Sequence, residues 1–212
     1  MRGKFISLEG GEGSGKTTAI QFIRQWLDDH NIPYVMTREP GGTPLAEEIR
    51  QLILSPRSER VNDITELLLV FAARAQHLAE KIQPALAHGT WVISDRFLDS
   101  SYVYQGKARG GDIVMLDQLS QWVVGDNKPD ATLLLDVAVE LGQERVVQRQ
   151  HQDRLDKESL AFHQKVRDGF LERAQADPER VRVVDASQSL DSVKQQIEEQ
   201  LVKLNNAWTG NS

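Results

Sequence analysis

Residues 10–19 read GGEGSGKTTA and place four glycines directly before one lysine and two threonines. They follow the apolar run KFISLE (4–9) and lead into residues 16–29, whose apolar side chains recur at helical spacing. The stretch satisfies G-x-x-x-x-G-K-[ST], and its place between a strand and a helix is the context which that pattern requires. Glycines let successive backbone N–H groups turn inward, and the helix N-terminus adds partial positive charge. The sequence therefore predicts a phosphate-binding loop, here called the phosphate loop (residues 10–17).

The side chains of the phosphate loop are of two kinds. Lys16 can reach the β- and γ-phosphates of a nucleoside triphosphate, and the Thr17 hydroxyl can ligate Mg²⁺. Glu12 differs, because a carboxylate facing bound phosphates costs electrostatic energy, so we expect it to point away from them. The segment's expected contacts to ATP are Gly10, Gly11, Glu12, Gly13, Ser14, Gly15, Lys16, Thr17 and Thr18.

Short apolar runs alternate with longer segments of helical periodicity along the whole chain. The pattern predicts an α/β fold, with a five-stranded parallel sheet covered by helices on both faces in three layers, α/β/α. The expected strands are residues 4–9, 33–37, 90–95, 131–136 and 181–185. The expected helices are 16–29, 44–54, 64–87, 112–124, 139–150, 158–175 and 189–204. In such sheets, ligands bind beyond the carboxyl ends of the strands.

The composition narrows the function. The 212 residues suit a single domain. With a net charge of −6, the chain lacks the broad basic surface that is expected of a nucleic-acid binder. No segment approaches the roughly 18 apolar residues of a membrane span. The sequence contains no cysteine, which excludes thiolate chemistry and disulfides and agrees with a cytoplasmic location. We therefore expect no nucleic-acid partner and no membrane partner.

A phosphate loop alone does not separate kinases from regulatory NTPases. Residues 127–130 read NKPD and match the letters of the guanine-reading N-K-x-D signature of GTPases. They precede the expected strand 131–136 instead of following one, so their side chains would lie at the wrong edge of the sheet. We interpret NKPD as a coincidental loop, and a regulatory P-loop NTPase or interaction module stays the alternative from another class.

Four further segments favour a kinase with a small acceptor. REPGGTP (38–44) follows the second strand, FAAR (71–74) lies on the long helix, DRF (95–97) closes the third strand, and SSYVYQG (100–106) comes next. With the phosphate loop, they resemble the bacterial thymidylate kinases, in the same order and over nearly the whole chain. The resemblance implies one P-loop kinase domain, residues 1–212, with a small helical lid at about 145–157.

The resemblance implies roles for several residues of these segments. Arg38 and Arg96 contact the acceptor monophosphate, and arginine's planar fork suits that task. Asp95 stands where phosphate-loop proteins place a Mg²⁺-associated carboxylate, so Thr17 and Asp95 are the expected metal residues. Phe71 is the candidate for stacking on thymine, although several family members carry their aromatic at the position of Val70. The expected dTMP-binding residues are Glu12, Arg38, Pro40, Leu52, Phe71, Arg74, Arg96, Ser101, Tyr104 and Gln105.

The phosphate loop has no arginine of its own, and family members of this kind carry the catalytic arginine in the lid. Arg149 is the first candidate and Arg154 the second, and both are expected to contact ATP. Ser187, after the last strand, resembles the segment that passes the adenine.

The resemblance implies an enzyme that transfers the γ-phosphoryl group of ATP to dTMP, giving dTDP and ADP for dTTP synthesis, with Mg²⁺ as cofactor. The expected catalytic residues are Glu12, Lys16, Asp95, Arg96 and Arg149, and Glu12 is expected to meet the acceptor's 3′-hydroxyl. Another nucleotide kinase is the rival of the same class. The family is typically a homodimer, and the long helix 64–87 could form the interface.

Overall fold

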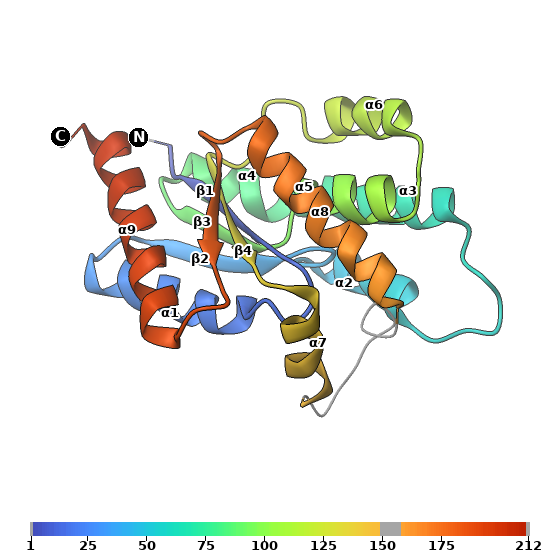
Figure 1. Cartoon of the computed structure of the whole chain (residues 1–212). Helices are drawn as coiled ribbons and strands as arrows, with labels where there is room; N and C mark the ends of the chain where they lie inside the picture. Colours follow the sequence, from blue (N-terminus) through green and yellow to red (C-terminus); the bar gives the residue numbers. More distant parts are fainter. Residues whose placement is uncertain (1, 149–157, 211–212) are drawn as a thin grey trace.

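The computed structural model describes residues 2–148 and 158–210, and one parallel five-stranded sheet forms its centre, in the order β2-β3-β1-β4-β5 (Figure 1). The strands are β1 (Phe5–Glu9), β2 (Tyr34–Arg38), β3 (Trp91–Asp95), β4 (Ala131–Asp136) and β5 (Val181–Asp185). All five expected strands are confirmed to within one residue. Near-continuous apolar runs are the pattern that a parallel strand needs when both of its faces are covered.

The helices follow the expected order. They are α1 (Lys16–Asp29), α2 (Pro44–Leu54), α3 (Asp63–His77), α4 (Gln83–Ala87), α5 (Leu98–Ser101), α6 (Ile113–Val123), α7 (Val139–Val147), α8 (Leu160–Ala176) and α9 (Leu190–Thr209). Two π-helical segments join them, η1 (Leu78–Ile82) and η2 (Tyr102–Ala108). The expected helix 64–87 is thus α3, η1 and α4 in succession, whereas the helical stretch 98–108 was not predicted. None of the described helices has the length and apolar character that a membrane crossing requires.

Successive side chains of β1 point to opposite faces of the sheet, and the helices that they contact lie on those two faces. Ile6 and Leu8 pack with α1 and α9 on one face, whereas Phe5 packs with α3, α4 and α6 on the other. A third apolar cluster joins η2 and α8 over β4. Figure 1 shows α1 and α9 on one side of the sheet and α3, α5 and α8 on the other. The predicted three-layer α/β/α arrangement is confirmed.

The order of the strands brings the functional loops together. β1 lies between β3 and β4, with Leu8 opposite both Asp95 and Leu133. The phosphate loop leaves β1, and the DRF segment leaves the neighbouring β3, so both lie at the carboxyl edge of the sheet. In α/β sheets a crevice forms at such a point, where successive crossovers leave in opposite directions.

Glu9 ends β1 as a fully buried carboxyl group that holds the turn after β3. Its Oε1 accepts hydrogen bonds from the Phe97 and Ser100 backbone N–H groups (2.8 and 3.3 Å), and its Oε2 accepts one from Ser100 Oγ at 2.6 Å. Burial and the nearby Asp99 carboxylate together raise the pKa of Glu9 to about 7, against the lowering effects of Arg96 and of the hydrogen bonds from Ser100 and Phe97. Glu9 therefore takes up a proton on folding at mildly acidic pH.

This uptake predicts a pH-dependent stability that Glu9→Gln removes. Between pH 4.5 and about 7, native Glu9 binds a proton that the unfolded chain has released, so the Glu9 contribution to stability falls as pH rises. A shift of this size corresponds to roughly 3 kcal/mol. Chemical denaturation from pH 4.5 to 8 should give a free energy of unfolding that falls more steeply for the wild type than for E9Q. The exposed Glu80→Gln serves as control, and parallel curves for wild type and E9Q would contradict the prediction.

Candidate active site

The phosphate loop turns through glycines in left-handed or extended conformations before α1 begins. Gly13 has φ 73°, and a Cβ there would lie 2.0 Å from the carbonyl oxygen of Gly142 on α7. A Cβ on Gly142 would in turn lie 2.6 Å from Glu12 O. The loop and α7 therefore pack backbone against backbone, and Arg145 on α7 donates to Gly13 O and Ala186 O (3.4 and 3.1 Å). Gly142 was not predicted, although an isolated glycine within a helical pattern is a signal of close packing.

Lys16 lies at the start of α1 and folds back over the loop. Its Nζ donates to the carbonyl oxygens of Gly10 and Gly11 at 3.1 and 3.3 Å. Burial lowers the Lys16 pKa, and Arg96 lowers it further, whereas the Glu12, Asp95 and Glu9 carboxylates raise it. The ammonium group is thus held by weak carbonyl acceptors, which an incoming phosphate can replace.

A groove of about 430 Å³ opens on the outer side of the loop. It is lined by Ser14, Gly15 and Thr18 together with Arg145, Ala186 and Gln188. Ser187 was expected to contact ATP, but it does not line this groove. Its hydroxyl donates a hydrogen bond to Asp185 Oδ1. Its neighbours Ala186 and Gln188 take its place.

Glu12 points away from the loop amides, as expected, and joins an ion pair at the carboxyl edge of β3. Its Oε1 accepts hydrogen bonds from Arg96 Nη2 at 2.7 Å and from the Tyr104 hydroxyl at 2.8 Å. Burial alone would raise the Glu12 pKa, but Arg96, Lys16, Tyr104 and His163 together lower it to about 2. Glu12 is therefore ionised throughout the physiological range.

Arg96 is held in a backbone conformation that is rare for its residue type. Its φ is 67°, a strain of about 1–3 kcal/mol that persists only where surrounding contacts fix it. Here its backbone N–H donates to Leu8 O at 2.9 Å, and Nη1 donates to Gly10 O at 3.0 Å. The guanidinium carbon lies 4.9 Å from the centre of the Tyr104 ring. An observed strain of this kind is typical of functional positions.

A cavity of about 230 Å³, here called the cationic cavity, lies between the phosphate loop and the turn after β3. Four basic side chains and three acids surround it. It is lined by Glu12, Lys16, Thr17, Arg38, Glu39, Pro40, Arg50, Leu54, Asp95 and Arg96. Arg38 pairs with Glu47 at 2.8 Å at its rim. Arg50 was not predicted; it lies on α2 one turn beyond Glu47, and its Nη1 donates to Pro40 O at 2.9 Å.

Thr17 and Asp95 were the expected metal residues, and both line the cationic cavity. Asp95 Oδ1 is buried and has no hydrogen-bond partner among the described residues. No cluster of three or more His, Cys, Asp or Glu side chains suited to a metal occurs in the described part of the chain. The donor set fits Mg²⁺, which uses one or two protein oxygens and takes its remaining ligands from water and phosphates.

The apolar cavity adjoins the cationic one and shares Glu39, Pro40 and Arg96 with it. Its volume is about 70 Å³. It is lined by Glu39, Pro40, Ile53, Leu54, Val70, Arg74, Arg96, Phe97, Ser100, Ser101, Tyr104 and Gln105. Six expected dTMP-binding residues therefore meet here: Pro40, Arg74, Arg96, Ser101, Tyr104 and Gln105.

Two expectations about this cavity differ from the structure. Val70 lines it, whereas Phe71 does not: its ring packs in the core with 2 % of its surface exposed, and its centre lies 4.8 Å from the Arg74 guanidinium carbon. Leu52 is 52 % exposed and does not line it, whereas the next two residues on α2, Ile53 and Leu54, do. In both cases the expected residue is one or two positions away from the residue that lines the cavity. Each position along a helix turns the side chain by about 100°.

Arg74 is almost fully buried and belongs to a network that was not predicted. Its Nε donates to Glu39 Oε2 at 2.7 Å, its Nη1 to Ser101 Oγ at 2.9 Å and its Nη2 to Phe97 O at 3.1 Å. His77 Nδ1 lies 3.0 Å from Glu39 Oε1. The network offsets the charge of Arg74 and fixes its guanidinium at the wall of the apolar cavity.

The NKPD segment lies at the opposite edge of the sheet. Asp130 Oδ2 accepts a hydrogen bond from the Phe5 backbone N–H at 2.7 Å, at the amino end of β1. NKPD therefore lies at the wrong edge of the sheet for a guanine-reading loop, as predicted. Arg149 and Arg154 lie outside the described residues, so their roles stay predictions.

Comparison with known proteins agrees with this geometry. The family model described as thymidylate kinase matches residues 8–197. A thymidylate kinase from Marinomonas sp. (strain MWYL1) is 88% identical over 210 residues, which cover 99% of each chain. Thymidylate kinases from Vesicomyosocius okutanii and Alcanivorax borkumensis are 51% and 49% identical, over 93% and 98% of this chain and 96% and 100% of their own. The chain belongs to the thymidylate kinase family.

Proposed function

We propose that this protein is an ATP-dependent kinase that converts dTMP and ATP to dTDP and ADP, a step in the synthesis of dTTP. The observation that carries the proposal is the joint opening of a cationic and an apolar cavity beside one phosphate loop. A nucleoside monophosphate has one anionic and one largely apolar end, which match the two cavities. Nothing in the geometry favours a regulatory NTPase, which needs no second cavity for an acceptor.

Two phosphates must meet in line for the transfer. A phosphate oxygen of dTMP attacks the γ-phosphorus, and the bond from that phosphorus to the bridging oxygen of ADP breaks. No covalent enzyme intermediate is needed, because the acceptor oxygen is already a nucleophile and positioning and electrostatics dominate. Lys16 and the loop amides hold the donor phosphates, while Arg38, Arg50 and Arg96 hold the acceptor phosphate.

Mg²⁺ is the proposed cofactor. It would be held by Thr17 and Asp95 and would neutralise charge on the transferred group. The buried, unpaired Asp95 Oδ1 supports this assignment. Arg149, with Arg154 as second candidate, is proposed to supply transition-state charge from a lid at about 145–157 of this single kinase domain.

We further propose a cytoplasmic homodimer that binds neither membranes nor nucleic acid. Large apolar side chains are exposed on α3 and on the neighbouring α6, and they support an interface there. They are Ile64, Leu68, Ile113, Val114 and Trp122, with 49% to 86% of their surfaces exposed. An apolar surface of this kind on two adjacent helices suits a two-fold interface.

An ADP-release assay with a panel of nucleoside monophosphates tests the activity. We expect dTMP to give the highest kcat/KM, because the apolar cavity offers Arg74, Ser101 and Gln105 to the edge of a pyrimidine and Tyr104 beside the sugar. CMP, UMP and AMP should be much poorer acceptors. Turnover of any of these at a rate equal to that of dTMP would contradict the thymidylate assignment.

Glu12→Ala should impair use of the acceptor and spare the donor. The substitution removes the carboxylate that holds Arg96 and Tyr104, and hydrogen bonds to charged groups contribute enough that kcat/KM for dTMP should fall about a hundredfold. The KM for ATP should change by less than about twofold, because Glu12 faces away from the loop amides.

Glu144→Ala on α7 is the control, since it removes an exposed acid near the same loop, and E12Q keeps the size of the side chain while removing its charge. A parallel rise in KM for ATP and for dTMP in E12A would show that Glu12 serves the whole loop instead of the acceptor side.

A further inference from the structure

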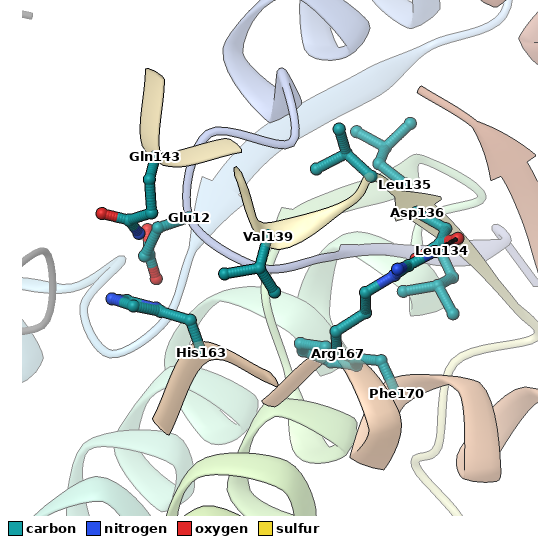
Figure 2. Close-up of a pocket in the computed structure, with 11 residues that line it drawn as sticks. Glu12, Leu134, Leu135, Asp136, Val139, Gln143, His163, Arg167 and Phe170 are labelled. Carbon is teal, nitrogen blue, oxygen red and sulfur yellow. Dashed lines mark hydrogen bonds and ion pairs between the residues drawn. The ribbon is translucent and has the colours of Figure 1, made fainter. Parts of the chain in front are cut away.

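A small cavity lies behind Glu12, on the side away from Arg96. The phosphate loop, the carboxyl end of β4, α7 and α8 enclose it, and Glu12, Val139, Gln143 and His163 are among the residues that line it. Figure 2 shows His163 reaching from α8 toward Glu12 and Gln143. Its volume is about 20 Å³. A single water molecule needs about 10–15 Å³ by the same measure.

His163 presents an unsatisfied polar atom at this cavity. The side chain is buried, with 4% of its surface exposed, and Nε2 has no hydrogen-bond partner among the described residues. A buried polar atom left in this state costs about 1–3 kcal/mol. The imidazole is also one of the groups whose charge lowers the pKa of Glu12, which places the two side chains near each other.

The Glu12 carboxylate can accept further hydrogen bonds on the side that faces this cavity. Both hydrogen bonds that described residues donate to its carboxylate, from Arg96 and Tyr104, arrive at Oε1. An ionised carboxylate can accept about four hydrogen bonds over its two oxygens. The other end of the cavity is already satisfied, because Asp136 and Arg167 form a two-pronged ion pair there at 2.8 and 2.9 Å. The polar groups that still lack hydrogen-bond partners among the described residues therefore lie at the His163 end of the cavity.

We propose that this cavity is a water-binding site, in which one ordered water bridges His163 Nε2 and the Glu12 carboxylate, with the Gln143 amide as a further partner. His163 donates its Nε2 hydrogen to the water, and the water donates to Glu12. A buried water normally makes about three hydrogen bonds, the number these partners supply. The inference rests on the proposed function, in which Glu12 positions the acceptor.

The water makes His163 a positioning residue. Arg96 and Tyr104 hold Glu12 from the acceptor side, and the bridged His163 holds it from α8. Without the bridge, the carboxylate keeps its ion pair but gains freedom to turn toward the vacated side. Acceptor binding should suffer from this, while the loop amides that bind ATP are unaffected.

Three substitutions at one position test the bridge by steady-state kinetics. H163F keeps a ring of similar size and removes both nitrogens, so kcat/KM for dTMP should fall about tenfold, the effect expected from losing one hydrogen bond to a charged group. H163Q places an amide nitrogen near the position of Nε2 and should restore kcat/KM to within about threefold of wild type. H163N is polar but too short to reach the water and should resemble H163F. The KM for ATP should stay constant throughout.

His88→Phe is the matched control, because it replaces an exposed histidine at the end of α4 and should leave all constants unchanged. Equal constants for wild type and H163F, or equal losses in H163Q and H163N, would overturn the water bridge. If H163F does not fold, the comparison of H163Q with H163N decides alone. Failure of the wild-type protein to phosphorylate dTMP would instead overturn the proposed function, so the two failures are distinguishable.

Discussion

The contact between Glu12 and Arg96 joins the two loops on which the whole site is built. Glu12 belongs to the phosphate loop after β1, and Arg96 follows the neighbouring β3, so their ion pair at 2.7 Å ties the phosphate loop to the turn after β3. Arg96 accepts a left-handed backbone at φ 67° in order to make it. Such strain persists only where surrounding contacts over-determine it, and here the Leu8, Gly10 and Ser100 partners do so. The pair is reinforced by further contacts between the same segments, because Arg96 Nη1 donates to Gly10 O and Glu9 Oε1 accepts from the Phe97 N–H.

The environment makes two acids at one strand end behave in opposite ways. Glu9 is buried beside Asp99, and its pKa rises to about 7. Glu12, three residues later, lies between Arg96 and Lys16, and its pKa falls to about 2. Burial raises the pKa of both, and the sign of the nearest charges decides the outcome. Glu9 therefore acts as a structural hydrogen-bond acceptor for the turn after β3, whereas Glu12 keeps a permanent negative charge where the two loops meet.

Sequence reasoning succeeded where a local pattern carries a physical mechanism. The apolar runs identified the five strands because a parallel strand must be buried on both faces, and the loop pattern located Lys16 because glycines and a helix start are needed together. It failed where the outcome depends on contacts between distant segments. The close approach of Gly13 and Gly142 joins residues far apart in the chain, and no single window of sequence reports it. The choice between Val70 and Phe71 depends on helical phase, since both residues are apolar and both are buried.

The buried Arg74 and its partner Glu39 give the apolar cavity an electrostatic environment unlike that of the cationic cavity. Glu39 lies 2.7 Å from Arg74 and offsets its charge, so the apolar cavity offers hydrogen-bond donors without an excess of positive charge. The cationic cavity has four basic side chains against three acids, one of which, Asp95, has an oxygen left unpaired by the described residues. The arginines of the apolar cavity are already paired, Arg74 with Glu39 and Arg96 with Glu12, whereas a base in the cationic cavity would leave charged groups desolvated and unpaired. On the proposed function, the two cavities define one orientation for a nucleoside monophosphate, with its phosphate toward the phosphate loop, before any chemistry begins.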